Sequence, residues 1–153
     1  MYGEPRRIRE VAERLERRAD QLRAEADALH AASDAVAWVS TAADRMRAEA
    51  RERRDELRRV AREYDEAAER VRAHASEVAR LLDLIATIER QVRSLISEAA
   101  GRLRDAVTAV ASGIKDALTP GDEDDERLAA TPTPPPGHKD WLDMPDRVPG
   151  VRL

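Results

Sequence analysis

Apolar residues recur every seven positions along most of this chain. Near the N-terminus, a series of large apolar residues is accompanied by a series of small residues four positions later: Ile8, Leu15, Leu22, Leu29 and Val36, then Ala12, Ala19, Ala26 and Ser33. Two longer series follow: Met46, Arg53, Val60, Ala67, His74, Leu81, Ile88 and Leu95, then Ala50, Leu57, Tyr64, Val71, Val78, Ile85, Val92 and Ala99. Because seven residues are about two helical turns, each series lies along one side of a helix. The pattern predicts an all-α fold of helices that pack side by side.

Composition agrees with helices that pack through small residues. Aromatic residues make up 3% of the chain and Phe is absent, so a conventional globular core is poorly supplied. Charged residues make up 38%, and residues 1–118 contain as many acidic as basic side chains. Such a balance is typical of helices with solvated, ion-paired faces.

Local signals divide the helical region, residues 1–118, near Trp38. Pro5 suits a first helical turn, and helix propensity falls around Trp38. Thr41 with Asp44 resembles a capping box, and Ser40 is an alternative cap. We expect helices at about 5–37, 41–77 and 78–118, the last two either separate or continuous, with the first two paired as an antiparallel hairpin.

A single rod is the alternative to the hairpin. The seven-residue phase of the first helix continues through Trp38 into the second. An uninterrupted helix over residues 6–118 would be roughly 170 Å long and would need a partner helix along its length.

Two groups of residues from these seven-residue series are expected to have different roles. The first is expected to hold the hairpin together: Leu15, Leu22, Leu29, Leu57, Val60 and Tyr64. The second forms a richer apolar stripe expected to bind a protein partner or a second copy: Val78, Leu81, Ile85, Ile88, Val92 and Leu95. Arg53 and His74 lie on the same series and are expected to act as polar layers that set the register.

Residues 119–153 differ from the rest of the chain. They contain eight acidic and four basic residues, and therefore carry the whole net charge of −4. Pro120 and Gly121 end the helical pattern, and a proline-rich run over 131–137 predicts an extended linker. We expect a disordered, acidic tail that contains a short docking motif of Trp141, Leu142 and Met144.

No grouping of catalytic or ligand-binding residues is found. Cysteine is absent, and the three histidines, His30, His74 and His138, have no partner at a metal-ligand spacing. We therefore expect no enzyme activity, no catalytic residues, no cofactor and no metal. Eight arginines between Arg45 and Arg62 alternate with acidic residues, which disfavours nucleic-acid binding.

Targeting signals are also missing. No apolar run approaches the roughly 18 residues of a membrane span, and residues 1–11 lack the apolar core of a signal peptide. The expected location is the cytoplasm, or the outside of the cell by a route without a cleaved signal peptide.

The segment around Trp38 resembles the turn of the WXG helical-hairpin family of bacterial type VII secretion substrates. Trp38 corresponds to the family's tryptophan, Ser40 replaces its glycine, and Ala42-Ala43 matches the alanine pair that opens its second helix. Tyr64 is followed four residues later by Ala68, where the family's export motif has an acidic residue. The resemblance covers roughly residues 5–80 and implies a helical hairpin exported through a type VII route.

The leading hypothesis is a non-enzymatic, type VII secretion-associated protein that acts by helix–helix binding. One alternative is a homo-oligomeric coiled-coil scaffold. The other is a membrane-active protein in which the amphipathic segment 78–118 contacts lipid.

Overall fold

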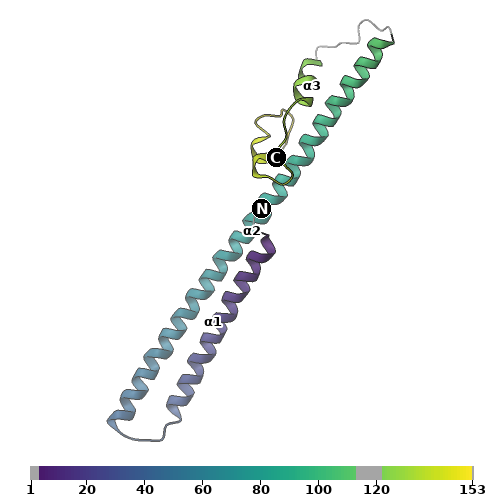
Figure 1. The fold of residues 1–153 in the computed structure, drawn as a ribbon. Coiled ribbons are helices and arrows are strands. Elements are labelled where there is room, and N and C mark those ends of the chain that lie inside the picture. The colour runs from purple at the N-terminus through teal and green to yellow at the C-terminus, as the bar shows by residue number, and fades with distance from the viewer. Residues whose placement is uncertain (1–3, 113–121, 153) are drawn as a thin grey trace. The chain divides into compact units, whose positions relative to one another are not determined.

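The computed structural model describes residues 4–112 and 122–152, and these residues form helices and connecting segments without a β-strand. In chain order these residues form the α-helices α1 (Pro5–Asp34), α2 (Thr41–Ala111) and α3 (Asp122–Ala129), labelled in Figure 1, and then a 3₁₀-helix, η1 (Lys139–Asp143). The prediction of an all-α fold is confirmed. The chain divides into two compact units, residues 1–79 and 80–153, which are described separately.

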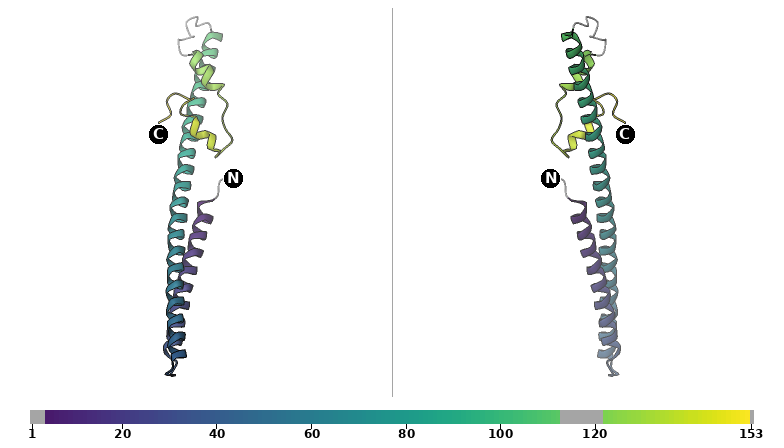
Figure 2. Two further views of the ribbon diagram at one scale, coloured as in Figure 1. Left: turned by 90° about the vertical axis from the view of Figure 1, so that its left-hand side faces the viewer. Right: turned by 90° about the vertical axis from the view of Figure 1, so that its right-hand side faces the viewer.

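The first unit is a helical hairpin. α1 has Pro5 in its first turn and ends at Asp34, three residues earlier than predicted. Residues 36–39 are non-helical, in agreement with the low helix propensity of valine and tryptophan there. The chain then reverses, and the first half of α2 runs alongside α1 in the opposite direction (Figure 2). The predicted hairpin is confirmed, and the uninterrupted rod is wrong.

Ser40 is the residue that caps α2. Its Oγ accepts a hydrogen bond from the N–H of Ala43 at 3.1 Å, and its carbonyl accepts one from the N–H of Asp44 at 3.0 Å. This is the geometry of an N-terminal serine cap. The cap expected first, Thr41, is instead the first residue of the helix.

α2 continues without a break past residue 77, so the second and third predicted helices are one helix. It extends to Ala111 within the described residues. The predicted end of this helix at residue 118, and the Thr119-Pro120-Gly121 stop, lie outside them.

Alanine makes the contact between the two helices of the hairpin. The buried apolar residues of this unit are eight alanines and one leucine: Ala12, Ala19, Ala26, Ala43, Ala50, Ala61, Ala68, Ala75 and Leu22. Because the distance between helix axes depends on the side chains at the contact, alanine allows the two helices to approach closely. Leu57, Val60 and Tyr64 pack around the central cluster of Ala19, Leu22 and Ala61. The hairpin is therefore held mainly by alanines together with Leu22, and the other large apolar residues lie beside them.

The second unit contains a core that the C-terminal segment completes. Its buried residues come from α2 and from the segment around η1: Ile85, Ile88, Val92, Trp141, Met144 and Val148. The prediction of a disordered tail is wrong for residues 122–152, because α3 is helical and the segment after it is folded onto α2. Residues 119–121 and 153 lie outside the described residues.

Two features of the C-terminal segment explain how an acidic, proline-rich stretch folds. Acidic residues begin α3, where the positive end of the helix dipole stabilises negative charge. Gly137 adopts a φ of +68°, a conformation that glycine reaches without steric cost, at the end of the proline run. The chain then enters η1, where His138 accepts a hydrogen bond from the N–H of Asp140 and caps the first turn.

Candidate helix-docking surface and exposed turn

Ion pairs cross one side of the hairpin. Asp27 pairs with Arg58 at 2.7 Å, Arg23 pairs with Asp65, and Glu16 pairs with Arg72. As the residue number rises along α1, the number of the residue with which it pairs on α2 falls, as an antiparallel register requires. We call this side the paired flank.

The paired flank sets the register of the hairpin and adds little to its stability. The hydrogen bond with Asp65 raises the pKa of Arg23 above its ordinary value. Both side chains are about two-fifths exposed, and exposed ion pairs contribute at most about 1 kcal/mol each. The pairs therefore align the helices, and the alanine contact does most of the packing.

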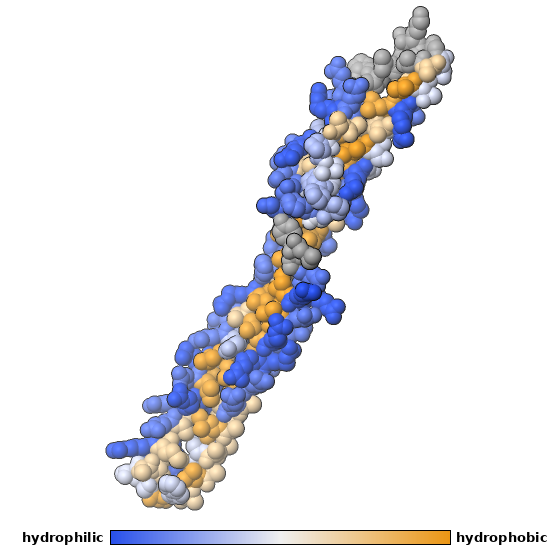
Figure 3. All heavy atoms as spheres, in the orientation of Figure 1, coloured by the Kyte–Doolittle hydropathy of each residue, from blue (hydrophilic) through white to orange (hydrophobic). Residues whose placement is uncertain are grey.

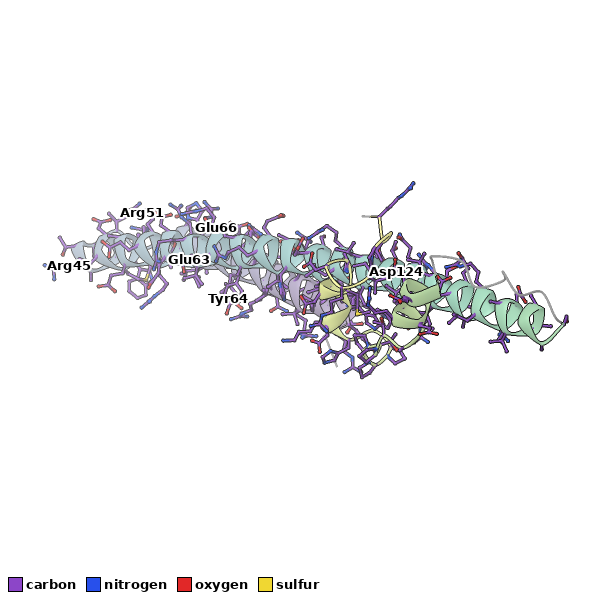
Figure 4. The ribbon with its side chains drawn as sticks, turned by 90° about the horizontal axis from the view of Figure 1, so that it is seen from above. Arg45, Arg51, Glu63, Tyr64, Glu66 and Asp124 are labelled. Atoms are coloured by element: carbon purple, nitrogen blue, oxygen red, sulfur yellow. The ribbon has the colours of Figure 1, made fainter. Side chains whose placement is uncertain are left out.

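The opposite side of the hairpin is apolar, and we call it the apolar flank. Its members are large side chains that are half-buried or exposed: Ile8, Val11, Leu15, Leu29, Met46, Leu57, Val60, Tyr64 and Val71. Val11 is 37% exposed. Figure 3 shows a hydrophobic, orange stripe along the hairpin between blue borders. Figure 4 shows Tyr64 on the side of α2 next to α1, whereas Glu66 points away from it.

Two open grooves lie on the apolar flank. One, of about 510 Å³, is lined by Leu29, Met46 and Ala50 together with the charged side chains beside them. The other, of about 590 Å³, is lined by Ile8, Val11, Ala67, Val71 and the bordering Arg7, Arg70 and His74. The second groove, whose lining is mainly apolar and is bordered by charged side chains, suits the apolar face of another helix.

The polar layers expected at Arg53 and His74 are not formed. Both side chains are exposed and lie at the borders of the two grooves. The buried position is taken by Ala75, one residue after His74. Because one residue turns a helix by about 100°, burial of Ala75 places His74 outside the contact.

The predicted turn residues lie where the chain reverses. Trp38 is 67% exposed and Val39 is 99% exposed. The guanidinium of Arg47 donates to the carbonyl oxygens of Val36 and Trp38, at 2.8 Å and 2.9 Å, and pairs with Asp44 at 3.1 Å. Arg47 therefore closes the turn from the beginning of α2. No sequence signal separates it from the seven other arginines nearby.

The stripe predicted to bind a partner is largely covered by the chain itself. Ile85, Ile88 and Val92 are at most 4% exposed, and the C-terminal segment packs against them. Leu95 borders this core, while Val78 and Leu81 are half-buried. The prediction of a free stripe is wrong, because sequence periodicity reveals an apolar surface and not what covers it.

The predicted docking motif of the tail does dock, but within the same chain. Trp141 and Met144 are fully buried, and Leu142 packs at the border of the core. The indole Nε1–H of Trp141 donates to the carbonyl oxygen of Pro135 at 2.8 Å. The guanidinium carbon of Arg93 lies 5.6 Å from the ring centroid, within the range of a cation–π contact.

Polar contacts hold both ends of the C-terminal segment, residues 122–152, on α2. The side-chain amide of Gln91 donates to the carbonyl oxygen of Arg152 at 2.9 Å and accepts from its N–H at 2.8 Å. Near α3, Arg102 donates twice to the carboxylate of Asp125, at 2.8 Å and 2.6 Å. This pair of hydrogen bonds lowers the pKa of Asp125 and raises that of Arg102.

Over residues 4–112 and 122–152, no group of three or more His, Cys, Asp or Glu side chains is placed to hold a metal ion. Within the same residues, no helix is both long and apolar enough to cross a membrane. Comparison of the chain with known proteins finds no matching family model, no matching curated protein and no matching solved structure.

Proposed function

We propose that this is a non-enzymatic helical protein that binds the helices of a protein partner through the apolar flank of its hairpin. One observation carries the proposal: apart from Leu22, the buried apolar residues of the hairpin are alanines, whereas nine large apolar residues remain partly exposed beside them. Two helices alone cannot bury the side chains on both sides of the line along which they contact each other.

The energetics favour a helical partner. Completing the burial of one leucine or valine side chain contributes on the order of 1 kcal/mol, since full burial from water contributes about 1.5–3 kcal/mol. The nine side chains of the apolar flank extend along the whole hairpin, so one long helix, or a second hairpin, would contact most of them. Ion pairs already cover the paired flank, which leaves the apolar flank as the side on which a partner gains most.

We assign this binding to a type VII secretion-associated role. The support is the resemblance around Trp38 together with the position of that residue. It lies in an exposed turn between two antiparallel helices, and Ser40 caps the second of them.

A photocrosslinking experiment tests the binding proposal. A photoreactive amino acid replaces Tyr64 on the apolar flank in one variant and Glu66, which points away from α1, in a matched control. We expect protein adducts at position 64 and few at position 66. Equal yields at the two positions would contradict the proposal.

The adducts also identify the partner. Mass spectrometry distinguishes a second copy of this chain, which a homo-oligomeric scaffold would give, from a different helical protein. The apolar flank could take either, and an adduct with itself alone would favour the scaffold alternative.

Export is tested separately. The protein is followed in cells with an intact type VII system and in matched cells whose secretion ATPase is inactive. We expect it in the medium of the first culture only. Complete retention in both cultures would overturn the secretion role and leave the binding proposal standing.

A further inference from the structure

The turn between α1 and α2 presents apolar side chains to water. Trp38 and Val39 are neighbours in sequence, and both are mostly exposed. Residues 35–43 form an uncharged run, Ala-Val-Ala-Trp-Val-Ser-Thr-Ala-Ala. Figure 3 shows this end of the hairpin in tan and white, in contrast to the blue flanks of the helices.

Several backbone groups of the turn are hydrogen-bonded within the protein. Arg47 donates to the carbonyl oxygens of Val36 and Trp38, while Ser40 accepts from the first amides of α2. Unpaired backbone groups are what make it costly to remove a loop from water. With these groups paired internally, moving this turn into a less polar medium costs less than it would for an open loop.

The charges around the turn cancel. Between residues 34 and 47 there are two aspartates and two arginines, and Arg47 is paired with Asp44 at 3.1 Å. The turn therefore carries no net charge that would attract or repel an anionic surface. Any attraction to a membrane must come from the apolar side chains.

We propose that the turn, residues 35–43, inserts Trp38 and Val39 into the headgroup region of a phospholipid bilayer and anchors the hairpin peripherally. Tryptophan is suited to this region because its ring is apolar and its N–H can bond to water or to lipid oxygens. A bilayer accepts two neighbouring side chains on a turn without a pre-formed cavity. The inference goes beyond partner binding, because it uses the end of the hairpin and leaves the apolar flank free.

The test uses the full chain and vesicles of phosphatidylcholine. Co-sedimentation gives the partition coefficient, and lipids brominated on their acyl chains report contact by quenching tryptophan emission. We expect Trp38→Ala to lower the partition coefficient about tenfold or more, because burial of a large apolar side chain is worth at least about a factor of ten. Val39→Asp is expected to weaken binding comparably. The remaining tryptophan, Trp141, is fully buried and is not expected to be quenched.

Val107→Asp is the matched control. Val107 is 70% exposed, close to the 67% of Trp38, but it lies in the last turns of α2, and its replacement is expected to leave binding unchanged. Circular dichroism verifies that each variant is folded. Adding phosphatidylglycerol is expected not to strengthen binding.

Three results would overturn the proposal. The first is that the wild-type chain does not sediment with the vesicles, which would leave the turn as a candidate protein contact. The second is that Trp38→Ala binds as well as the wild type or that Val107→Asp loses as much. The third is a strong, salt-sensitive gain with phosphatidylglycerol, which would place the membrane contact on a basic surface elsewhere.

Discussion

Replacing Trp141 by alanine is expected to release the C-terminal segment from α2. The indole is fully buried among Ile85, Ile88 and Val92, and its N–H bonds to the carbonyl oxygen of Pro135. The substitution removes the largest buried side chain of the second unit and leaves a cavity that the neighbouring residues fill only incompletely.

The free-energy cost of this substitution follows from the surface that the indole buries and the hydrogen bond that it makes. A buried aromatic side chain removes about 150–250 Å² from water, which at about 25 cal/mol per Å² corresponds to about 4–6 kcal/mol. Some of this is retained by the alanine, and the net loss of one hydrogen bond adds about 1 kcal/mol. Substitutions of buried tryptophan by alanine cost about 3–5 kcal/mol. We therefore expect opening of the segment to become about 100-fold to a few thousand-fold more frequent.

Amide hydrogen exchange measures this opening. The N–H of Val148 bonds to the carbonyl oxygen of Met144 at 2.8 Å, so its exchange reports whether the segment is closed. Trp38→Ala is the control, because Trp38 is exposed and exposed substitutions change stability by about 0.5 kcal/mol or less. Trp141→Phe keeps most of the ring but loses the hydrogen bond, and is expected to raise exchange about tenfold. If Trp141→Ala accelerates exchange no more than Trp38→Ala, the indole does not anchor the segment.

Three further predictions concern the hairpin and α3. Ala61→Leu is expected to lower the free energy of unfolding by about 1–3 kcal/mol in a denaturant titration, because Ala61 is fully buried in the helix contact, whereas Ala42→Leu at an exposed site is expected to be close to neutral. Ser40→Ala is expected to cost about 1 kcal/mol in the same titration through loss of the cap, and an unchanged midpoint would contradict that role. The pKa of Asp125 is lowered, so its ion pair with Arg102 stabilises the docked α3 above the ordinary carboxyl pKa of about 3.9 and loses this effect as pH falls through the lowered value. The side-chain carboxyl chemical shift of Asp125 is expected to change below about pH 4, and Arg102→Gln is expected to move that change to higher pH.

Short-range features of the fold were predictable from the sequence. The helical class follows from the seven-residue spacing, and the reversal near Trp38 follows from low helix propensity beside a capping residue. Each depends on residues a few positions apart, whose interactions are the same in any helix. Between the two possible caps, Ser40 and Thr41, the choice depended on where the first turn of α2 begins, which local propensity does not determine to the residue.

Long-range features were not predictable in this way. Arg47 contacts carbonyl oxygens 9 and 11 residues earlier in the chain, and only the geometry of the turn brings them together. The roles given to Arg53 and His74 failed because the exact rotation of α2 against α1 depends on which alanines make the contact.

The sequence by itself determined that the protein is a set of amphipathic helices with a break near Trp38 and an apolar stripe beyond residue 77. Only the tertiary structure decided that this stripe is covered by residues of the same chain, and that the hairpin has one ion-paired and one apolar flank. The physical reason is distance along the chain. The cover is held by contacts between residues 48 and 61 positions apart, such as Glu89 with Gly137 and Gln91 with Arg152. Local periodicity reveals that an apolar surface must be buried, whereas the identity of the segment that buries it depends on how the whole chain packs.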